Sequence, residues 1–416
     1  MRTIPRESPA IRYLAINGTV EAGYEPVAEA FADNFRRRRE RGAACTIYHR
    51  GQKVVDIWAG TRCHRSEAEW ERETLSLVFS VTKGMAAAAM AVAHGKGYFE
   101  LDAPVADYWP EFGTAGKSSI TVRQLMSHQA GVITIDRPVT PQDLADHDRM
   151  GRWLAQQEPL WKPGQYHGYH TFTLGWYQNE LIRRTDPQGR TLGQFFDAEI
   201  ARPLDADFYI GLPESVPDHQ ISRTHGYHKI KALAHLNELP PGMIAAGIWP
   251  RSLTARSVKF MRLGDPATLA DPKFRRVEIP SAGGFGQARA VARIYDVLAR
   301  GGQELGLDGK TFGELCRPAT MPERGSRDVV LKLNVGYGFG FSKPSDGFQF
   351  GSDEAAFGCP GAGGCFAMAD PSTELAFAYL TNTMSFRIFD DPRERAVREA
   401  MYRCAGASTL NHTRAA

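Results

Sequence analysis

The stretch of sequence that decides the fold reads Leu77-Val78-Phe79-Ser80-Val81-Thr82-Lys83-Gly84, followed by Met85-Ala86-Ala87-Ala88-Ala89-Met90-Ala91-Val92-Ala93. An apolar run of this length predicts a helix buried in the domain, with its N-terminus near Ser80 facing a cleft. Positions i and i+3 of a helix share one face, so the amine of Lys83 can reach the hydroxyl of Ser80. The spacing Ser-x-x-Lys occurs only once in the chain. It therefore predicts a serine nucleophile whose base is a lysine.

Burial of the helix separates two interpretations of this pair. In a buried helix, desolvation lowers the pKa of Lys83 and makes its neutral amine available as a base. On an exposed helix, Ser80 is only an N-cap and Lys83 is a surface lysine with an ordinary pKa. The local sequence is compatible with both.

Composition narrows the class of protein and its partners. The chain has 416 residues, 43% of them hydrophobic, which is enough for a large core. Its 50 basic and 47 acidic residues leave a net charge of +3, and the basic run Arg36-Arg37-Arg38-Arg39-Glu40-Arg41 is typical of a solvated helix end. We therefore expect no nucleic acid as a partner. The sequence does not indicate an oligomeric state.

The cellular location is predicted from three features that the sequence lacks. The N-terminus lacks the apolar core of a signal peptide, and no stretch is apolar enough to span a bilayer. The six cysteines are scattered without the spacing of metal ligands. We therefore expect a cytoplasmic protein with reduced thiols and no membrane span.

The two ends of the chain predict strands, and the middle predicts helices. Antiparallel hairpins are expected from residues 45–49 with 54–58 and from 364–369 with 374–380, and these ends should pair into one sheet. Helices are expected from Asp391 to Cys404, after the caps Thr121 and Thr140, from Phe172 to Arg184 and from Gln287 to Arg300, whereas 203–250 should be irregular.

The sequence lacks the motifs of several other enzyme classes. The chain contains neither Gly-x-Ser-x-Gly nor His-Glu-x-x-His. His-Gly-Tyr-His occurs at 167–170 and 225–228, but the glycine in each predicts loops, and no carboxylate lies at ligand spacing. The glycines of 336–340 lack the spacing of a dinucleotide fingerprint. We expect no metal and no cofactor.

Four segments in order resemble a known family. They are Ser80-Val81-Thr82-Lys83, Ile120 to Gly131, Trp161-Lys162-Pro163-Gly164 leading to Tyr169-His170-Thr171, and Phe357 to Gly364. From about residue 25 to 405 the chain resembles the serine β-lactamase-related hydrolases of the class C type, and within them the family VIII carboxylesterases.

The resemblance implies a fold and its division into parts. We expect an α/β protein of the α+β type with the β-lactamase/transpeptidase-like fold, in which an antiparallel sheet flanked by helices adjoins a mostly helical domain. A single catalytic unit would span 20–405, with a sheet subdomain at 20–75 and 280–405 and a helical subdomain at 76–279. Residues 1–19 would be an N-terminal extension and residues 406–416 a C-terminal tail.

The resemblance also implies the roles of the site residues. Ser80 would attack an acyl carbonyl, and Lys83 and Tyr169 would serve as general base and acid, with Tyr169 sharing the base role beside the Lys83 cation. The backbone N–H groups of Ser80 and Ala362 would bind the oxyanion. Substrate-binding positions would be Thr171, Cys359, Gly361 and His170, although His170 could instead satisfy backbone groups.

Two departures from the family pattern bear on the substrate. Position 359 is cysteine where relatives carry lysine or histidine, and a neutral thiol cannot pair with a substrate carboxylate. Thr171 stands where penicillin-recognising members have asparagine. Both favour a small-molecule ester over a lactam. An acyltransferase that uses an alcohol acceptor, a β-lactamase or peptidase-type amide hydrolase, and a non-catalytic binding member remain alternatives.

Overall fold

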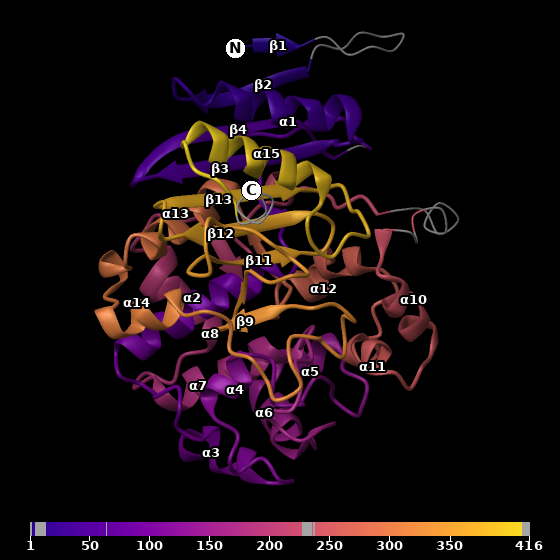
Figure 1. The fold of residues 1–416 in the computed structure, drawn as a ribbon. Helices are drawn as coiled ribbons and strands as arrows, with labels where there is room; N and C mark the ends of the chain where they lie inside the picture. Colours follow the sequence, from indigo (N-terminus) through magenta and orange to yellow (C-terminus); the bar gives the residue numbers. More distant parts are fainter. Residues whose placement is uncertain (1, 5–13, 64, 227–234, 236–237, 410–416) are drawn as a thin grey trace.

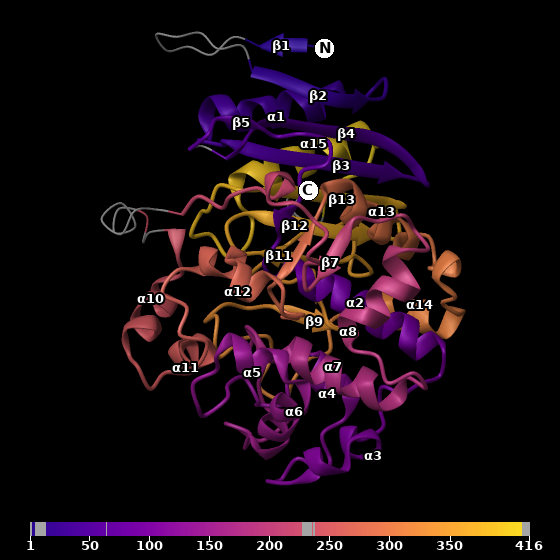
Figure 2. The same cartoon turned by 180° about the vertical axis from the view of Figure 1, so that it is seen from behind.

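A ten-stranded antiparallel sheet and a mostly helical region lie side by side in the molecule (Figures 1 and 2). The structure is a computed structural model, and it describes residues 2–4, 14–63, 65–226, 235 and 238–409. The predicted combination of an antiparallel sheet, flanking helices and a helical region is confirmed. None of the described helices is long and apolar enough to cross a bilayer.

The large sheet joins the two ends of the chain. Its strand order is β1-β2-β4-β3-β13-β12-β11-β10-β9, with β5 paired to β4. The strands are β1 (Arg2–Ile4), β2 (Leu14–Val20), β3 (Gly42–His49), β4 (Gln52–Cys63), β5 (Ala68–Glu69), β9 (Gly336–Gly338), β10 (Phe341–Lys343), β11 (Phe357–Gly361), β12 (Cys365–Asp370) and β13 (Leu375–Thr381). A second sheet of three strands has the order β6 (Ser76–Leu77), β8 (Gly284–Gly286), β7 (Phe208–Ile210).

Both predicted hairpins are confirmed. β3 and β4 are joined by Arg50 and Gly51, whose φ angles of 52° and 77° are the left-handed values of a tight hairpin turn. β12 and β13 form the other hairpin, and β13 pairs with β3 from Leu375 opposite His49 to Thr381 opposite Ala43. The first and last strand pairs therefore share one sheet, as the sequence predicts. Toward one edge of the sheet, β2 pairs with β4 and β1 pairs with β2, so residues 14–20 belong to the sheet as well.

The two faces of the sheet carry different side chains because successive residues of a strand point in opposite directions. On β13, Phe377 and Tyr379 pack in a core cluster with α1 (Glu25–Arg37) and α15 (Pro392–Cys404). Ala376 and Ala378 of the same strand pack in another cluster with α2 (Val81–Gly95) and α13 (Ala288–Ala299). Large side chains on one face and small ones on the other let α2 and α13 approach the sheet closely.

The remaining helices build the region beside the sheet. They are α3 (Val105–Tyr108), α4 (Val122–Met126), α5 (Pro141–Ala145), α6 (His147–Gln156), α7 (Thr173–Thr185), α8 (Leu192–Phe196), α10 (Pro241–Ile248), α11 (Leu253–Lys259), α12 (Pro272–Arg275) and α14 (Gly309–Cys316). Short turns are η1 (Pro110–Gly113), η3 (Asp218–Gln220), η5 (Pro266–Ala270) and η6 (Gln303–Leu305), with a π-helical turn η2 at Asp197–Ala201.

The predicted helix starts are confirmed by their caps. Thr121 accepts a hydrogen bond from the backbone N–H of Gln124 at 3.1 Å, and the Gln124 side chain accepts one from the backbone N–H of Thr121. Thr140 and Asp143 form the same reciprocal arrangement at α5. The expectation for 203–250 is wrong in part, because this segment contains β7 and α10. β7 is held by long-range pairing with β8, which local sequence does not reveal.

Candidate active site

The turn before α2 leaves the Ser80 side chain without a capping hydrogen bond. Phe79 has a φ of +48°, a strained value for a residue other than glycine. The Thr82 hydroxyl donates to the Phe79 carbonyl at 2.5 Å and accepts from the backbone N–H of Gly284 at 2.9 Å, which fixes the turn against β8. Ser80 precedes the first residue of α2, but its side chain makes no capping hydrogen bond. Its hydroxyl therefore remains available for other partners.

Lys83 is buried, with only 1% of its surface exposed. Its Nζ atom lies 2.8 Å from the carbonyl oxygens of Thr171 and Ser281, and 3.4 Å from Oγ of Ser80. Desolvation lowers the pKa of Lys83 from 10.5 to about 7, a shift that the neighbouring Cys359 opposes. The interpretation of Lys83 as a surface lysine is therefore excluded.

The Tyr169 side chain meets this pair from the loop before α7. Its hydroxyl is hydrogen-bonded to the side chain of Ser80, and its ring centroid lies 4.7 Å from Nζ of Lys83. Desolvation raises the pKa of the Tyr169 phenol well above its usual value of 10, outweighing the opposite effect of the Ser80 hydrogen bond. The structure thus brings Ser80, Lys83 and Tyr169 together, and the phenol stays protonated at neutral pH.

Asp328 supports Tyr169 from behind, and no sequence motif marks it. This buried carboxylate accepts hydrogen bonds from the backbone N–H of Tyr169, from those of Val330 and Leu331, and from the Tyr337 hydroxyl at 3.2 Å. Burial raises the pKa of Asp328 to about 6. The Tyr337 ring stacks on Tyr169, with centroids 6.2 Å apart and planes inclined by 21°. One carboxylate therefore fixes both the backbone and the ring environment of Tyr169.

His170 lies inside the protein and is fully buried. Its backbone N–H donates to Nδ1 of His128 at 3.1 Å, and its own Nδ1 lies 2.8 Å from the carbonyl oxygen of Gly168. The His128 ring in turn lies 5.1 Å from the Tyr169 ring and 4.4 Å from the Tyr337 ring. The two histidines thus shape the loop that carries Tyr169. His128 lies in the segment Ile120 to Gly131, which carries part of the family resemblance, but the sequence did not predict its contact with the Tyr169 loop.

The loop after β11 lies against the Ser80 segment. A side chain at Gly361 would come within 2.4 Å of the Val78 carbonyl oxygen, so only glycine permits this approach. Gly363 has a φ of 87°, and its carbonyl accepts a 2.6 Å hydrogen bond from the buried Arg393. No described residue accepts a hydrogen bond from the backbone N–H of Ser80 or Ala362. Both donors are therefore free for a ligand.

Arg393 is itself held in a buried ionic cluster. Its guanidinium contacts Glu40 at 3.2 Å and Asp391 at 2.9 Å, and Glu40 also accepts hydrogen bonds from Tyr379 and Thr381. The cluster connects β13 and the start of α15 with the loop at Gly363. The conformation of that loop therefore depends on ion pairs among Arg393, Glu40 and Asp391.

Cys359 and Thr171 flank Lys83. The Cys359 thiol is buried beside Lys83 and the Tyr295 phenol, and burial raises its pKa to about 11. It is therefore a neutral thiol at physiological pH. A side chain at Gly84 would collide with the Tyr295 hydroxyl, which explains the glycine that follows Lys83. The Thr171 hydroxyl donates to Ser257 at 3.2 Å while its carbonyl accepts from Lys83.

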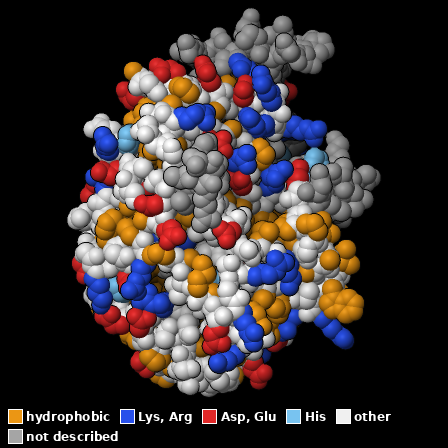
Figure 3. Space-filling model, viewed as in Figure 1, with side chains coloured by type: hydrophobic (Ala, Val, Ile, Leu, Met, Phe, Trp, Pro, Cys, Tyr) orange, Lys and Arg blue, Asp and Glu red, His pale blue; other side chains and the backbone are white. Residues whose placement is uncertain are grey.

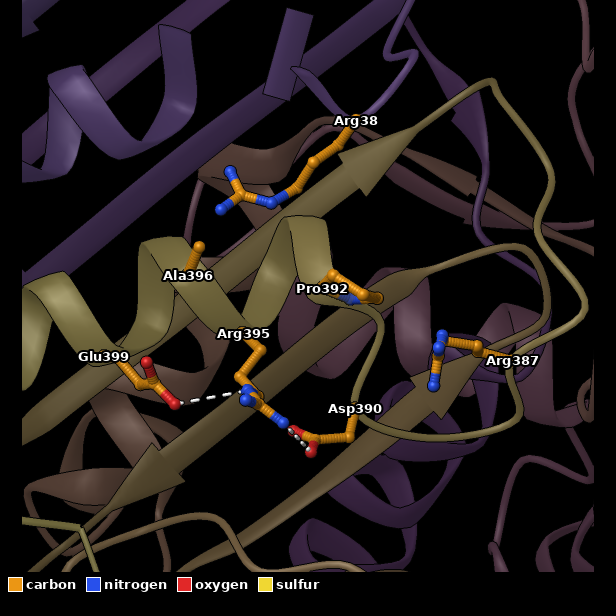
Figure 4. A pocket seen from close by; sticks show the side chains of 7 residues that line it. All are labelled: Arg38, Arg387, Asp390, Pro392, Arg395, Ala396 and Glu399. Carbon is orange, nitrogen blue, oxygen red and sulfur yellow. Dashed lines mark hydrogen bonds and ion pairs between the residues drawn. The ribbon is translucent and has the colours of Figure 1, made fainter. Parts of the chain in front are cut away.

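A surface recess of about 360 Å³ lies elsewhere, at the start of α15 (Figure 4). Its charged side chains largely pair with one another, since Arg395 contacts Asp390 at 3.0 Å and Glu399 at 3.2 Å. None of the residues around Ser80 lines it. Among the described residues, no three His, Cys, Asp or Glu side chains are arranged to hold a metal ion, and His228 lies outside them.

The fold and the comparisons with known proteins identify the chain as a serine hydrolase. The chain belongs to the beta-lactamase family, whose model matches residues 27–401. It is 34% identical over 378 residues to the esterase/beta-lactamase LipL of Mycobacterium tuberculosis, covering 88% of this chain and 83% of LipL.

Solved structures agree with this membership. A crystal structure of a family VIII carboxylesterase superposes with a TM-score of 0.83 at 33% identity, covering 94% of this chain and all of the other. EstA from Arthrobacter nitroguajacolicus Rue61a superposes with a TM-score of 0.79 at 30% identity, covering 93% and 98%. The predicted family and its β-lactamase/transpeptidase-like fold are thereby confirmed.

Replacement of the supporting carboxylate should slow reaction at Ser80 without unfolding the protein. We expect Asp328→Asn to reduce the rate of fluorophosphonate labelling at Ser80 by about tenfold or more. The substitution should displace the Tyr169 phenol from the Ser80 hydroxyl, and small displacements of a group beside the reacting atom lower the reaction rate strongly. Asp102→Asn, at a carboxylate whose side chain is 77% exposed, serves as the control and should label at the wild-type rate. Unchanged labelling of folded Asp328→Asn protein would show that Tyr169 needs no such support.

Proposed function

We propose that this protein cleaves carboxylic esters through an acyl-enzyme formed on Ser80. The observation that carries the proposal is the Ser80 hydroxyl, which has both the Lys83 amine at 3.4 Å and the Tyr169 phenol as neighbours. Relatives named as an esterase/beta-lactamase and as a family VIII carboxylesterase support the choice of ester chemistry.

Lys83 acts as the general base in the first step. A neutral amine has two N–H groups, and the carbonyls of Thr171 and Ser281 are placed to accept both. The lone pair then faces the Ser80 hydroxyl and takes its proton as Ser80 Oγ bonds to the acyl carbon. The backbone N–H groups of Ser80 and Ala362 stabilise the resulting oxyanion.

Tyr169 acts as the general acid. Because desolvation raises the pKa of its phenol, Tyr169 keeps its proton until the tetrahedral intermediate collapses. As the bond between the acyl carbon and the leaving oxygen breaks, that oxygen takes the Tyr169 proton and departs as the alcohol, and the Lys83 ammonium then returns a proton to Tyr169. This assignment gives the base role to Lys83 alone, in place of the shared base role expected from the sequence.

Water completes the cycle by attacking the acyl-enzyme. Lys83, neutral again, takes a proton from the water as the new C–O bond forms, and the proton returns to Ser80 Oγ when the carboxylic acid leaves. An alcohol that replaces water would give acyl transfer by the same route, so this second reaction needs no further group.

The surroundings of Lys83 favour esters over lactams. Cys359 is neutral and buried, so it offers no positive charge to the carboxylate of a penicillin or a peptide. The Thr171 hydroxyl is already bonded to Ser257. An uncharged ester needs neither contact.

Removal of the Ser80 hydroxyl or of the Lys83 amine should abolish turnover. We expect Ser80→Ala and Lys83→Ala each to lower kcat for p-nitrophenyl butyrate by about a thousandfold or more, because triad-like groups act as a unit. Cys359→Ser is the matched control and should retain most activity, since its thiol carries no charge and no proton-transfer role. Full activity of folded Ser80→Ala or Lys83→Ala protein would end the proposal.

The pH dependence of turnover should reveal the lowered pKa of Lys83. The base is the neutral form of Lys83, so kcat/KM should fall tenfold per unit as pH decreases below about 7 and level off above it. No decline should follow up to about pH 9, because the Tyr169 phenol keeps its proton there. A rise centred near pH 10 would instead indicate an ordinary lysine.

Substrate preference should follow the absence of a cation at position 359. We expect p-nitrophenyl esters of short and medium acyl chains to be hydrolysed with a kcat/KM at least about a hundredfold above that for nitrocefin, the equivalent of about 3 kcal/mol in transition-state binding. Absorbance assays of both substrates with one enzyme preparation provide the comparison. Nitrocefin cleaved as fast as the esters would contradict this preference.

A further inference from the structure

An apolar surface stands out on α10 and α11. Four large hydrophobic side chains are exposed among the described residues, and three of them fall within eleven positions: Ile248 at 77%, Trp249 at 63% and Val258 at 45%. In addition, α10 contains no buried residue although nearly every position in it is apolar. Exposed apolar side chains gathered in one place mark interaction sites more often than they occur at random.

The charged residues of the same segment are all basic. Residues 239–264 include Arg251, Arg256, Lys259 and Arg262 and no acidic residue. Arg256 pairs with Asp136, whereas Arg251 and Lys259 are exposed and have no ion pair with a described residue. Figure 3 shows orange side chains at the right-hand edge, where Figure 1 places α10 and α11, with blue ones nearby. Hydrophobic and basic groups are thus combined on one protruding element.

This surface adjoins the candidate active site. Ser257 of α11, next to Val258, accepts a hydrogen bond from the Thr171 hydroxyl, and the Thr171 carbonyl accepts one from Lys83. A partner that binds α10 and α11 would therefore lie on an element that is hydrogen-bonded to Thr171, a neighbour of Lys83.

We propose that Ile248, Trp249 and Val258, with Arg251 and Lys259, dock the protein on an anionic phospholipid surface. Aliphatic and tryptophan side chains enter the boundary between headgroups and acyl chains, while basic residues attract anionic headgroups. A second copy of the chain fits less well, because a two-fold contact through this surface would oppose like charges. The proposal concerns binding and does not depend on the ester reaction.

Sedimentation with vesicles tests the proposal. We expect the protein to pellet with vesicles of equal parts phosphatidylcholine and phosphatidylglycerol but not with phosphatidylcholine alone, and to be released at high salt. Ile248→Ser/Trp249→Ser and Arg251→Glu/Lys259→Glu should each weaken the partition coefficient by about tenfold or more. The charge-matched control is Arg72→Glu/Arg202→Glu, at side chains 62% and 71% exposed, which should bind as wild type.

Three results would overturn the proposal. They are no binding to the anionic vesicles, undiminished binding by both α10–α11 variants, and a concentration-dependent dimer that Ile248→Ser/Trp249→Ser abolishes in a protein that binds no vesicle. Unchanged thermal unfolding and unchanged hydrolysis of soluble p-nitrophenyl acetate would show that the variants are folded.

Discussion

The burial of a single amine is the constraint on which the rest of the site depends. Lys83 lies on α2, a helix that packs against α7, α13 and β11 and is apolar on nearly every side. In this setting a charged ammonium loses its water, so the neutral form becomes accessible near pH 7. Two carbonyls from distant parts of the chain, Thr171 and Ser281, then orient the amine toward Ser80. Contacts from a helix and from two distant segments therefore combine to lower the pKa of one amine and to hold it beside Ser80.

Features that local sequence encodes were predicted well. The hairpin at Arg50-Gly51 and the capped helix starts at Thr121 and Thr140 rest on contacts within a few residues, and so does the Ser80 and Lys83 spacing. The pairing of β13 with β3 is a long-range contact, but two strongly patterned strand pairs at the chain ends made it the natural arrangement.

Features that depend on distant contacts were not predicted. Nothing near Asp328 in the sequence shows that its carboxylate receives the backbone N–H of Tyr169. The direction of the Tyr169 pKa shift follows from desolvation, which a sequence motif does not specify, and it is the reason why the proposed mechanism keeps the acid role of Tyr169 and drops its shared base role. The exposure of α10 is equally a tertiary property, because its apolar composition alone is typical of a buried helix.

A direct titration of Lys83 measures the pKa on which the proposed mechanism depends. Protein labelled with nitrogen-15 at lysine side chains gives one NMR signal per amine, and the signal missing from Lys83→Met protein identifies the residue. We expect the Lys83 signal to titrate with a pKa near 7 in the folded enzyme without substrate. A pKa above about 9, close to that of a solvated lysine, would contradict this expectation.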